Sequence, residues 1–579
     1  MSEQSPSPQA KKQGPNLFGL LKPYAGWIIL LVVFAVASNG LNLTVPLIIS
    51  RGIDAYTQGH FDVNTTLIEF SLVAIGVFVF AYLQSIVQTI ASERAARDLR
   101  RQTSGKISRQ SYAFVQDTTP AKLLTNLTSD SDTVKMFVSM AVPTMVSSVF
   151  LIIGSSVLLL MLNWKLALVV LLIIPLIGAA LFLIFRKIRL LFRRAQEVID
   201  WLNKVINESI LGSALIRVLN AQQFEYDKFV AANTNAKDLG MQILRLFASL
   251  IPIITFIANM AALSILALGG HFVISGTMTL GQFAAFNSYL SILIFPIIMI
   301  GFISTVIGRA AASYQRISEV IASPDEPDTG NETSSLRGDI ALKNVTLRYG
   351  EKEALKNVSF EVKAGTKTAI IGPTGAGKTQ ILSVLTGLIQ PTEGTIEYDG
   401  KPLNTYEKAS FHRQLGLVFQ DSIIFNMTLR ENIAFGDAVT ESDMQKAIET
   451  AELKDFIETL PEKLETVVSE RGTSLSGGQK QRIMLARALA LNPKILLLDD
   501  FTARVDTSTE RKILDNVLSN YPGITILSVT QKIASAERFD QVVVLMEGEL
   551  IAQGTHEELM KSSPEYVQIY QSQRSTNEL

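Results

Sequence analysis

The sequence contains no cysteine among its 579 residues. This absence excludes disulfide bridges, thiolate metal sites and a cysteine nucleophile. The formal net charge is −1, so no overall basic character points to nucleic acid as a partner. The first residues are polar and lack the short apolar core of a secretory signal peptide. We expect residues 1–16 to form a disordered tail and residues 17–21 an amphipathic stretch that lies against a membrane.

Long apolar runs recur up to about residue 310 and then stop. Each run has room for the ~20 residues that a helix needs to cross a hydrocarbon core. The runs cover residues 27–49, 67–90, 138–162, 166–185, 250–274 and 283–307. Helices in a soluble core are usually shorter and carry a polar face. The runs therefore predict six transmembrane helices in a lipid bilayer.

Basic residues gather in two of the connections between these runs. They are Arg94, Arg97, Arg100, Arg101 and Lys106 after the second run, and Arg186, Lys187, Arg189, Arg193 and Arg194 after the fourth. Because Lys and Arg are enriched on the cytoplasmic side, we expect a multi-pass protein of the inner (plasma) membrane with both termini in the cytoplasm. The connections at 95–115 and 186–229 are predicted to continue as helices. Their turns, at 112–118 and 212–223, either dock on the soluble half or are simple solvated hairpins.

The apolar runs contain almost no ionisable residue, which argues against a proton-coupled carrier. Phe283, Phe286, Tyr289 and Phe295 recur at helical spacing in the last run, and Pro296 predicts a kink there. Such an aromatic stripe is typical of helix packing. The alternative is that it lines a substrate cavity.

A polar, acidic segment with Pro and Gly follows the last run and marks a domain boundary at residues 323–336. After it, short apolar strands alternate with helical stretches, which is typical of an α/β domain with a mostly parallel sheet. The expected fold is therefore an all-α polytopic membrane domain over residues 17–322, with long cytoplasmic extensions, and an α/β domain over residues 337–579.

Residues 372–379 match the phosphate-binding pattern G-x-x-x-x-G-K-[ST] at every fixed position. A strand is predicted before the pattern, at 366–371, and a helix after it, at 380–388, so backbone N–H groups and a helix N-terminus would face the phosphates. In this pattern Lys bridges the β- and γ-phosphates and the hydroxyl of Ser or Thr ligates Mg²⁺. The residues expected to hold the nucleotide are Gly372, Pro373, Thr374, Gly375, Ala376, Gly377, Lys378, Thr379 and Gln380. Asp499 closes a second apolar strand, at 495–499, and is the metal-associated carboxylate.

Residues 475–479 read Leu-Ser-Gly-Gly-Gln and are followed by Lys-Gln-Arg, which resembles the signature of ATP-binding-cassette (ABC) proteins. Six spans ahead of one such cassette resemble a half-transporter of the exporter type. The resemblance extends over the whole chain after about the first dozen residues. It implies an ABC nucleotide-binding domain with ATP and Mg²⁺ as cofactors.

The resemblance also implies roles for individual residues. Tyr349 would stack on adenine, because stacking requires only a flat π-face. Gln420 would contact Mg²⁺ and the interface with the membrane domain, while Ser476 and Gly478 would act on ATP bound by a partner cassette. Three further segments resemble family motifs: 428–433, a run typical of exporters; 469–472, which contacts a coupling helix but has Ser469 in place of the usual Gly; and 505–506, the D-loop.

Two catalytic positions depart from the family pattern. Asp500 stands where the family usually carries Glu, and Gln531 where it usually carries His. Asp is one methylene shorter, which draws the carboxylate back by about 1.5 Å. Losing a positioned base typically lowers a rate by about 10²–10⁴-fold. A Gln side chain donates hydrogen bonds but does not change protonation near neutral pH.

ATP sites of this family form between two cassettes, each site using the phosphate loop of one and the signature of the other. The deviations therefore predict one subunit of a heterodimeric exporter of the bacterial multidrug type, with a degenerate site of its own. The expected partner is a second, non-identical half-transporter with Glu and His at the two positions, and the expected substrates are small and amphipathic: drugs, lipids or peptides. The alternatives are a slow homodimeric exporter and a subunit whose ATP binding only gates or regulates its partner.

Overall fold

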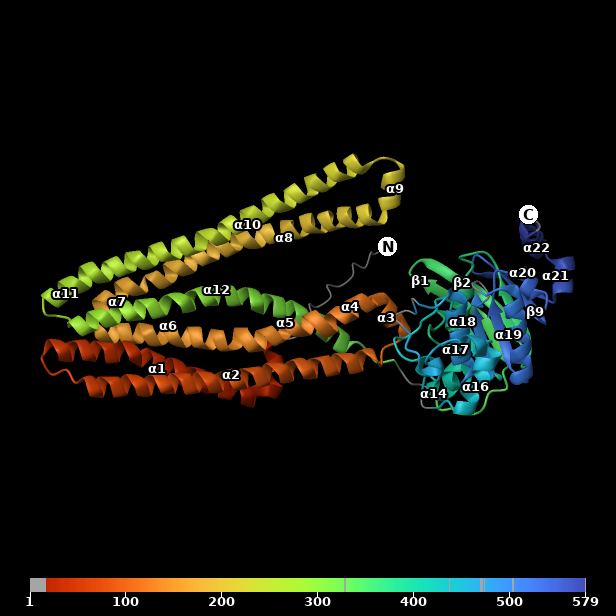
Figure 1. Ribbon diagram of the computed structural model, residues 1–579, viewed down its shortest axis with the longest axis horizontal. Helices are drawn as coiled ribbons and strands as arrows, with labels where there is room; N and C mark the ends of the chain where they lie inside the picture. The colour runs from red at the N-terminus through yellow and green to blue at the C-terminus, as the bar shows by residue number, and fades with distance from the viewer. Residues whose placement is uncertain are drawn as a thin grey trace, which may run out of the picture. The chain divides into compact units, whose positions relative to one another are not determined.

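The computed structural model describes residues 17–326, 330–436, 438–468, 472, 474–501 and 505–577. Contacts divide the chain into two compact units (Figure 1). The first contains residues up to 109 together with 118–324, and the second contains 110–117 together with the residues from 325 onward. The first unit is helical and the second is α/β, which confirms the predicted fold class.

The first unit contains 6 helical stretches, among the described residues, that are long and apolar enough to cross a membrane. They are Gly19–Thr57, Val63–Ile107, Pro120–Leu162, Trp164–Leu211, Gln222–Ile274 and Leu280–Ala322. Each predicted apolar run falls inside one of them. All are longer than a bilayer requires, because the helices continue past the apolar runs as the extensions predicted at 95–115 and 186–229, and also before the third run and after the sixth.

The elements of this unit and of the short helix that follows its second span are these: η1 Leu17–Tyr24, α1 Ala25–Thr57, α2 Val63–Ile107, α3 Tyr112–Thr118, α4 Pro120–Thr125, η2 Asn126–Asp130, α5 Ser131–Met136, η3 Phe137–Ala141, α6 Val142–Leu162, α7 Trp164–Leu171, α8 Ile173–Leu211, α9 Ser213–Val218, α10 Gln222–Ser264, η4 Ile265–Gly269, α11 Gly270–Ile274 and α12 Leu280–Ala322. Here η1 is a 3-10 helix, whereas η2, η3 and η4 are single π-helical turns. The predicted helix at 95–115 is interrupted, since α2 ends at Ile107 and the predicted turn at 112–118 is itself the helix α3.

The last helix, α12, packs along the core of the membrane unit. Phe286 and Tyr289 are fully buried there, and the Tyr289 hydroxyl donates to the Leu43 carbonyl of α1 at 2.8 Å. These two aromatic residues therefore serve helix packing. Phe295 of the same stripe is 64% exposed. Pro296 lies inside an uninterrupted α12.

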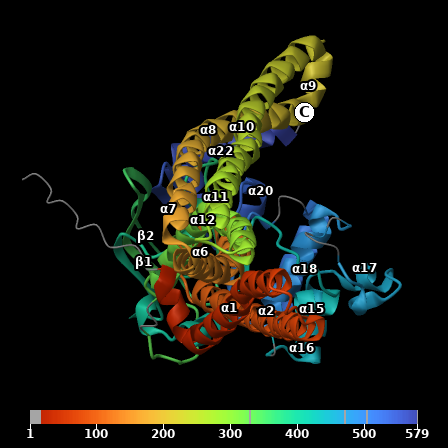
Figure 2. The ribbon, with the colours of Figure 1, turned by 90° about the vertical axis from the view of Figure 1, so that its left-hand side faces the viewer.

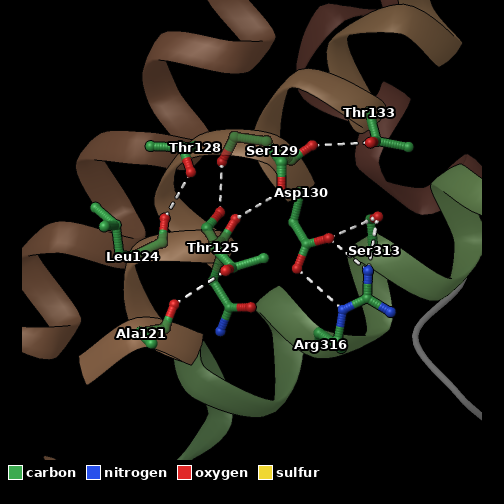
Figure 3. A network of polar contacts seen from close by, with 11 residues as sticks. Ala121, Leu124, Thr125, Thr128, Ser129, Asp130, Thr133, Ser313 and Arg316 are labelled. Atoms are coloured by element: carbon green, nitrogen blue, oxygen red, sulfur yellow. Dashed lines mark hydrogen bonds and ion pairs between the residues drawn. The ribbon is translucent and has the colours of Figure 1, made fainter. Parts of the chain in front are cut away.

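Polar contacts join α12 to its neighbours near both of its ends. At the first, the Asp54 carboxylate of α1 accepts from the Gly281 N–H and from the Thr279 hydroxyl, each at 2.8 Å. At the second, the Asp130 carboxylate accepts from Ser313 at 2.8 Å and from Arg316 at 3.0 and 2.5 Å (Figure 3). These hydrogen bonds near the two ends of α12 hold the helix in a fixed register against α1 and the π turn η2.

The helices α8 and α10 pack side by side as an arm that runs away from α1, α2, α6 and α12 to the short helix α9 (Figures 1 and 2). Apolar side chains at the end of this arm are solvent-exposed in the single chain, with Leu215 61% exposed, Val218 82% and Leu219 66%. Exposed apolar patches of this kind mark interaction surfaces.

The elements of the second unit follow: β1 Ile340–Tyr349, β2 Lys352–Val362, β3 Lys367–Ile371, α13 Lys378–Leu385, β4 Glu393–Tyr398, β5 Lys401–Pro402, η5 Leu403–Thr405, α14 Lys408–Arg413, β6 Leu415–Val418, α15 Leu429–Ile433, α16 Glu441–Thr450, α17 Lys454–Glu458, η6 Lys463–Glu465, α18 Gly477–Leu489, β7 Ile495–Asp499, α19 Thr507–Asn520, β8 Thr525–Val529, α20 Ile533–Ala536, β9 Gln541–Met546, β10 Glu549–Gly554, α21 His556–Ser562 and α22 Pro564–Asn577.

These strands form a four-stranded antiparallel sheet, β2-β1-β4-β5, and a six-stranded sheet, β10-β9-β3-β8-β7-β6. The larger sheet is parallel from β9 to β6. Alternate residues of a strand face opposite sides of a sheet. Accordingly, Leu496 and Leu498 of β7 enter one hydrophobic core, and Ile495 and Leu497 enter the other. A strand buried on both faces reads as a continuous apolar run, which is why β7 matches its predicted range.

Candidate functional site

A cavity of about 600 Å³ lies in the second unit, at the carboxyl ends of parallel strands, where ligands bind in open α/β sheets. It brings together most of the residues that the sequence singled out. Its lining comprises Tyr349, Lys352, Glu353, Ala354, Lys356, Thr374, Gly375, Gly377, Lys378, Thr379, Gln380, Gln420, Asp499, Asp500, Val529, Gln531, Glu547 and Gly548.

The loop between β3 and α13 is shaped by glycines that no other residue could replace without rearrangement. Gly377 has φ +96°, and a Cβ there would lie 2.7 Å from the Ala354 carbonyl oxygen. At Gly372, a Cβ would lie 2.1 Å from the Leu545 carbonyl oxygen. These contacts let the loop turn sharply from β3 into α13, whose N-terminus begins at Lys378, two residues before the predicted helix start. The helix dipole and free N–H groups there favour an anion.

The Lys378 ammonium is held over this loop. Its Nζ donates to the carbonyl oxygens of Gly372 and Pro373, both at 2.7 Å. Burial lowers the pKa of Lys378, whereas the carboxylates of Asp500 and Asp499 act in the opposite direction. The cavity therefore contains a cation fixed beside a helix N-terminus.

An oxygen pair lies next to this lysine. The Thr379 hydroxyl donates to the Asp499 carboxylate at 3.3 Å. Burial raises the pKa of Asp499, and the Thr379 hydrogen bond opposes that shift. Among the described residues there is no cluster of three or more His, Cys, Asp and Glu side chains. Mg²⁺ commonly takes one or two protein oxygens and completes its shell with phosphates and water, so the hydroxyl and carboxylate fit that donor set.

Asp500 follows Asp499 in an unusual backbone conformation, with φ +46°. Its N–H donates to the Val529 carbonyl at the end of β8, at 2.9 Å. The side chain is almost buried, and burial raises its pKa, with Lys378 and Lys532 opposing that shift.

Gln531 lines the same cavity with an exposed side chain. Its backbone carbonyl accepts from the Gln573 side chain at 2.6 Å, and the Ile533 N–H donates to Gln573 at 2.9 Å. Gln573 of α22 thus fixes the backbone that carries Gln531. No sequence pattern signals this role, because Gln573 lies 42 residues away from Gln531.

Tyr349 ends β1 at the cavity, with its ring 46% exposed and its hydroxyl donating to Gln380 at 2.9 Å. Lys352 pairs with Tyr349 in the β1–β2 hairpin. Sequence reasoning missed Lys352, Glu353, Ala354, Lys356, Val529, Glu547 and Gly548 as lining residues. Only the hairpin register could have placed Lys352 beside the tyrosine.

Some predicted site residues lie outside this lining. Gly372, Pro373 and Ala376 shape the loop without lining the cavity. Ser476 and Gly478 lie at the start of α18 and do not line the cavity either. Ser476 accepts from the Gln479 N–H in a capping box, so the signature is the N-terminal turn of a helix.

One resembling segment falls partly outside the described residues, because residues 469–471 are not described. Both residues of the predicted D-loop, Val505 and Asp506, are described. Asp506 caps α19, and hydrogen bonds from Ser508 and Thr509 hold the pKa of its carboxyl far below the usual range.

Comparison with protein families matches the ABC transporter transmembrane region over residues 28–297 and the ABC transporter model over residues 355–503. The uncharacterized ABC transporter ATP-binding protein YfiB of Bacillus subtilis (strain 168) is 33% identical over 567 residues, which cover 96% of this chain and 97% of YfiB. The ATP-dependent lipid A-core flippase of Syntrophus aciditrophicus (strain SB) is 28% identical over 567 residues, covering 96% and 94%. Among solved structures, a bacterial Atm1-family ABC exporter with ATP bound aligns with a TM-score of 0.78 and 25% identity, covering 96% of this chain and 99% of that one.

Proposed function

The chain belongs to the ABC transporter family, with a transmembrane region and an ATPase domain on one polypeptide, and from this premise we propose that it is the degenerate-site subunit of a heterodimeric exporter. It is a multi-pass membrane protein and a transport ATPase. In the proposed assembly it exports amphipathic substrates by alternating access, and its partner is a second, non-identical half-transporter. The membrane is the inner (plasma) membrane, with both termini in the cytoplasm.

The observation that carries this proposal is the composition of one cavity. Lys378, Thr379 and Asp499 line it beside Asp500 and Gln531. The first three supply the cation, hydroxyl and carboxylate that bind a nucleotide phosphate and its metal ion. The last two stand at the catalytic positions where this chain departs from the family pattern. A cavity that keeps its binding groups but changes its reaction groups suits a site that binds ATP and turns over slowly.

In this proposal the residues act as follows. Lys378 and the N–H groups at the start of α13 hold the β- and γ-phosphates. Thr379, Asp499 and Gln420 hold Mg²⁺, which neutralises phosphate charge during transfer. Tyr349 stacks on the adenine. Gly372, Pro373, Thr374, Gly375, Ala376 and Gln380 complete the cradle.

Hydrolysis requires a base that takes a proton from the attacking water within hydrogen-bond reach. Asp500 keeps a carboxylate but presents it on a shorter side chain. Burial raises the pKa of Asp500, which means that burial disfavours the ionised carboxylate that would act as the base. Gln531 offers an amide where an imidazole would carry charge. Both changes slow the reaction and leave nucleotide binding intact.

The signature supports a two-chain arrangement. Ser476 and Gly478 do not line this chain's own cavity, so they are available to the phosphate of a nucleotide held by another cassette. The exposed apolar residues of α9 likewise support a partner that covers them. The intact signature would complete the competent site on the partner.

The membrane unit supports an amphipathic substrate. Each candidate span contains an 18-residue window with at most 2 Asp, Glu, Lys or Arg and a mean hydropathy of at least 2.1. Ions and sugars require polar partners in such a path, whereas lipids, drugs and apolar peptides do not. One similar protein is named an ATP-dependent lipid A-core flippase, and a lipid belongs to this substrate class.

The test uses a tagged copy of this chain purified from its native membranes together with any half-transporter that accompanies it. We expect the pair to hydrolyse ATP and the chain alone to hydrolyse it at least about tenfold more slowly. Ser476→Arg in this chain should lower the activity of the pair, because it blocks the partner's competent site. Substrate-stimulated ATPase of the chain alone, equal to that of the pair, would instead establish a homodimeric exporter.

A further inference from the structure

The segment that follows Gln420 connects the nucleotide cavity to the helix of the signature. Gln420 lines the cavity, and residues 419–427, between β6 and α15, form neither strand nor helix. The helix α18 starts at the signature and ends at Leu489. A loop without regular structure takes its shape from side-chain contacts, and here these come from Asn432 of α15 and from Arg487 of α18.

Arg487, in the last turn of α18, makes three hydrogen bonds to this region. Its Nη1 donates to the Ile423 carbonyl at 3.0 Å, and its Nε and Nη2 donate to the carbonyl and side-chain oxygens of Asn432 at 2.6 and 2.9 Å. All three acceptors are neutral oxygens. Only the planar fork of a guanidinium presents several donors in one fixed geometry, so Lys could not reproduce the set.

Asn432 extends these contacts into the loop. It is fully buried, and its Nδ2 donates to the carbonyls of Phe425 and Thr428 at 3.0 Å, while its Oδ1 accepts from the Phe425 N–H at 3.0 Å. The amide therefore uses both its donors and its acceptor to close the loop onto α15. This explains the buried Asn in the run at 428–433, which the proposed function does not use.

Two aromatic rings flank the same guanidinium. The rings of Phe425 and Phe435 stack with centroids 4.9 Å apart, and the Arg487 guanidinium carbon lies 5.5 and 5.2 Å from them. Burial lowers the pKa of Arg487 to about 10, so it remains charged at neutral pH. The cation is thus held by ring faces and carbonyl dipoles rather than by a carboxylate.

We propose that Arg487 is a positioning residue that holds the loop from Gln420 to Phe425 in fixed geometry against the signature helix. When nucleotide binding in this chain's cavity moves Gln420, the loop and Arg487 pass that movement to the signature, which serves the second site. The link makes the weak site a regulator of the strong one. This inference deepens the proposed function and depends on it only for the identity of the second site.

The first measurement follows the geometry directly and needs no partner chain. Because the sequence has no cysteine, Ile423→Cys and Lys480→Cys place two spin labels, one on the loop and one near the signature, in the full-length chain with ATP present. We expect a narrow distance distribution that widens at least about twofold in Arg487→Met, since the three bonds that fix the loop are lost. Arg482→Met is the matched control, because Arg482 lies on the same helix but donates to the Glu452 carbonyl. It should leave the distribution unchanged.

The second measurement separates positioning from binding in the assembled transporter. We expect Arg487→Met to lower kcat about tenfold while the KM for ATP stays within about twofold. Arg487→Lys, which keeps the charge and apolar stem, should give an intermediate width and kcat, and it carries the test if the Met variant does not fold. An unchanged label distribution in both variants, or a rise in KM with kcat unchanged, overturns the proposal. A transporter that proves homodimeric would alter the proposed function but leave the label experiment intact.

Discussion

In the phosphate-binding half of the cavity, hydrogen bonds anchor the polar side chains: Lys378 to two carbonyl oxygens of its own loop and Thr379 to Asp499 of β7. In the other half, Asp500 occupies a left-handed backbone position and Gln531 presents an exposed side chain. The first half matches its family at every fixed position, and the second departs at both. In the proposed function, binding and turnover are thus supplied by different residues of one cavity, so variants should change them separately.

Removing the cation from the first half should have the largest effect on nucleotide binding. Lys378→Met leaves a phosphate site without its fixed charge, and truncating one partner of such a buried pair typically costs 2 kcal/mol or more, so we expect ATP affinity to fall at least about 30-fold. Titration with a fluorescent ATP analogue measures this change. Lys401→Met, at an exposed lysine paired with Glu332, is the control and should bind normally. Equal affinity in both variants would show that ATP is held elsewhere.

Restoring the family residues in the second half should raise turnover without improving binding. In Asp500→Glu combined with Gln531→His, a longer carboxylate reaches the attacking water and an imidazole can carry charge. We expect kcat at this site to rise about 10²-fold, with the affinity for ATP within about twofold of the parent chain. Single-turnover hydrolysis, in a pair whose competent site is inactivated, isolates the effect. A kcat that does not rise would place the limiting defect at other residues.

The sequence predicted the first half well because its information is local. The loop at 372–379 is bounded by a strand and a helix within a few residues, and β7 matches its predicted range because a doubly buried strand is one apolar run. The six membrane helices follow from the same kind of local signal. The full length of α12 does not, since hydropathy ends near residue 307 whereas α12 continues to Ala322, where Ala310 and Ile317 are buried and Ser313 and Arg316 bond Asp130.

What the sequence could not supply depends on contacts between distant residues. Gln573 fixes the backbone at Gln531 from 42 residues away, and Arg487 fixes the loop at Ile423 from 64 residues away. Neither residue belongs to a pattern with a recognisable spacing. The lysines of the β1–β2 hairpin line the cavity through strand register, which a motif does not encode.

Tyr349 offers a smaller change that sharpens the binding half. A ring that stacks on a base typically contributes about 1–3 kcal/mol, so Tyr349→Ala should weaken ATP binding about tenfold. Tyr349→Phe keeps the π-face and loses only the hydroxyl that donates to Gln380, so its affinity should stay within about twofold of the parent. Comparing ATP with inorganic triphosphate supplies the control, because a contact to adenine affects only the first. Equal losses in Ala and Phe variants would assign the effect to the hydroxyl.

The smallest expected effect concerns stability and comes from the burial that raises the pKa of Asp500. A carboxyl whose pKa is higher in the folded than in the unfolded state makes its full contribution to the stability of the fold at a pH below the unfolded pKa. This contribution is lost as the pH rises through the folded pKa. Asp500→Asn removes the ionisation, so at pH 7 the variant should melt about 2 °C higher in the absence of nucleotide. The difference should shrink as the pH is lowered toward about 4, where the parent carboxyl is protonated as well. Asp515→Asn, at an exposed position of α19, should leave the melting temperature unchanged. A variant that melts at a lower temperature than the parent at pH 7 would mean that the attraction between the Asp500 charge and Lys378 and Lys532 outweighs the cost of burying that charge.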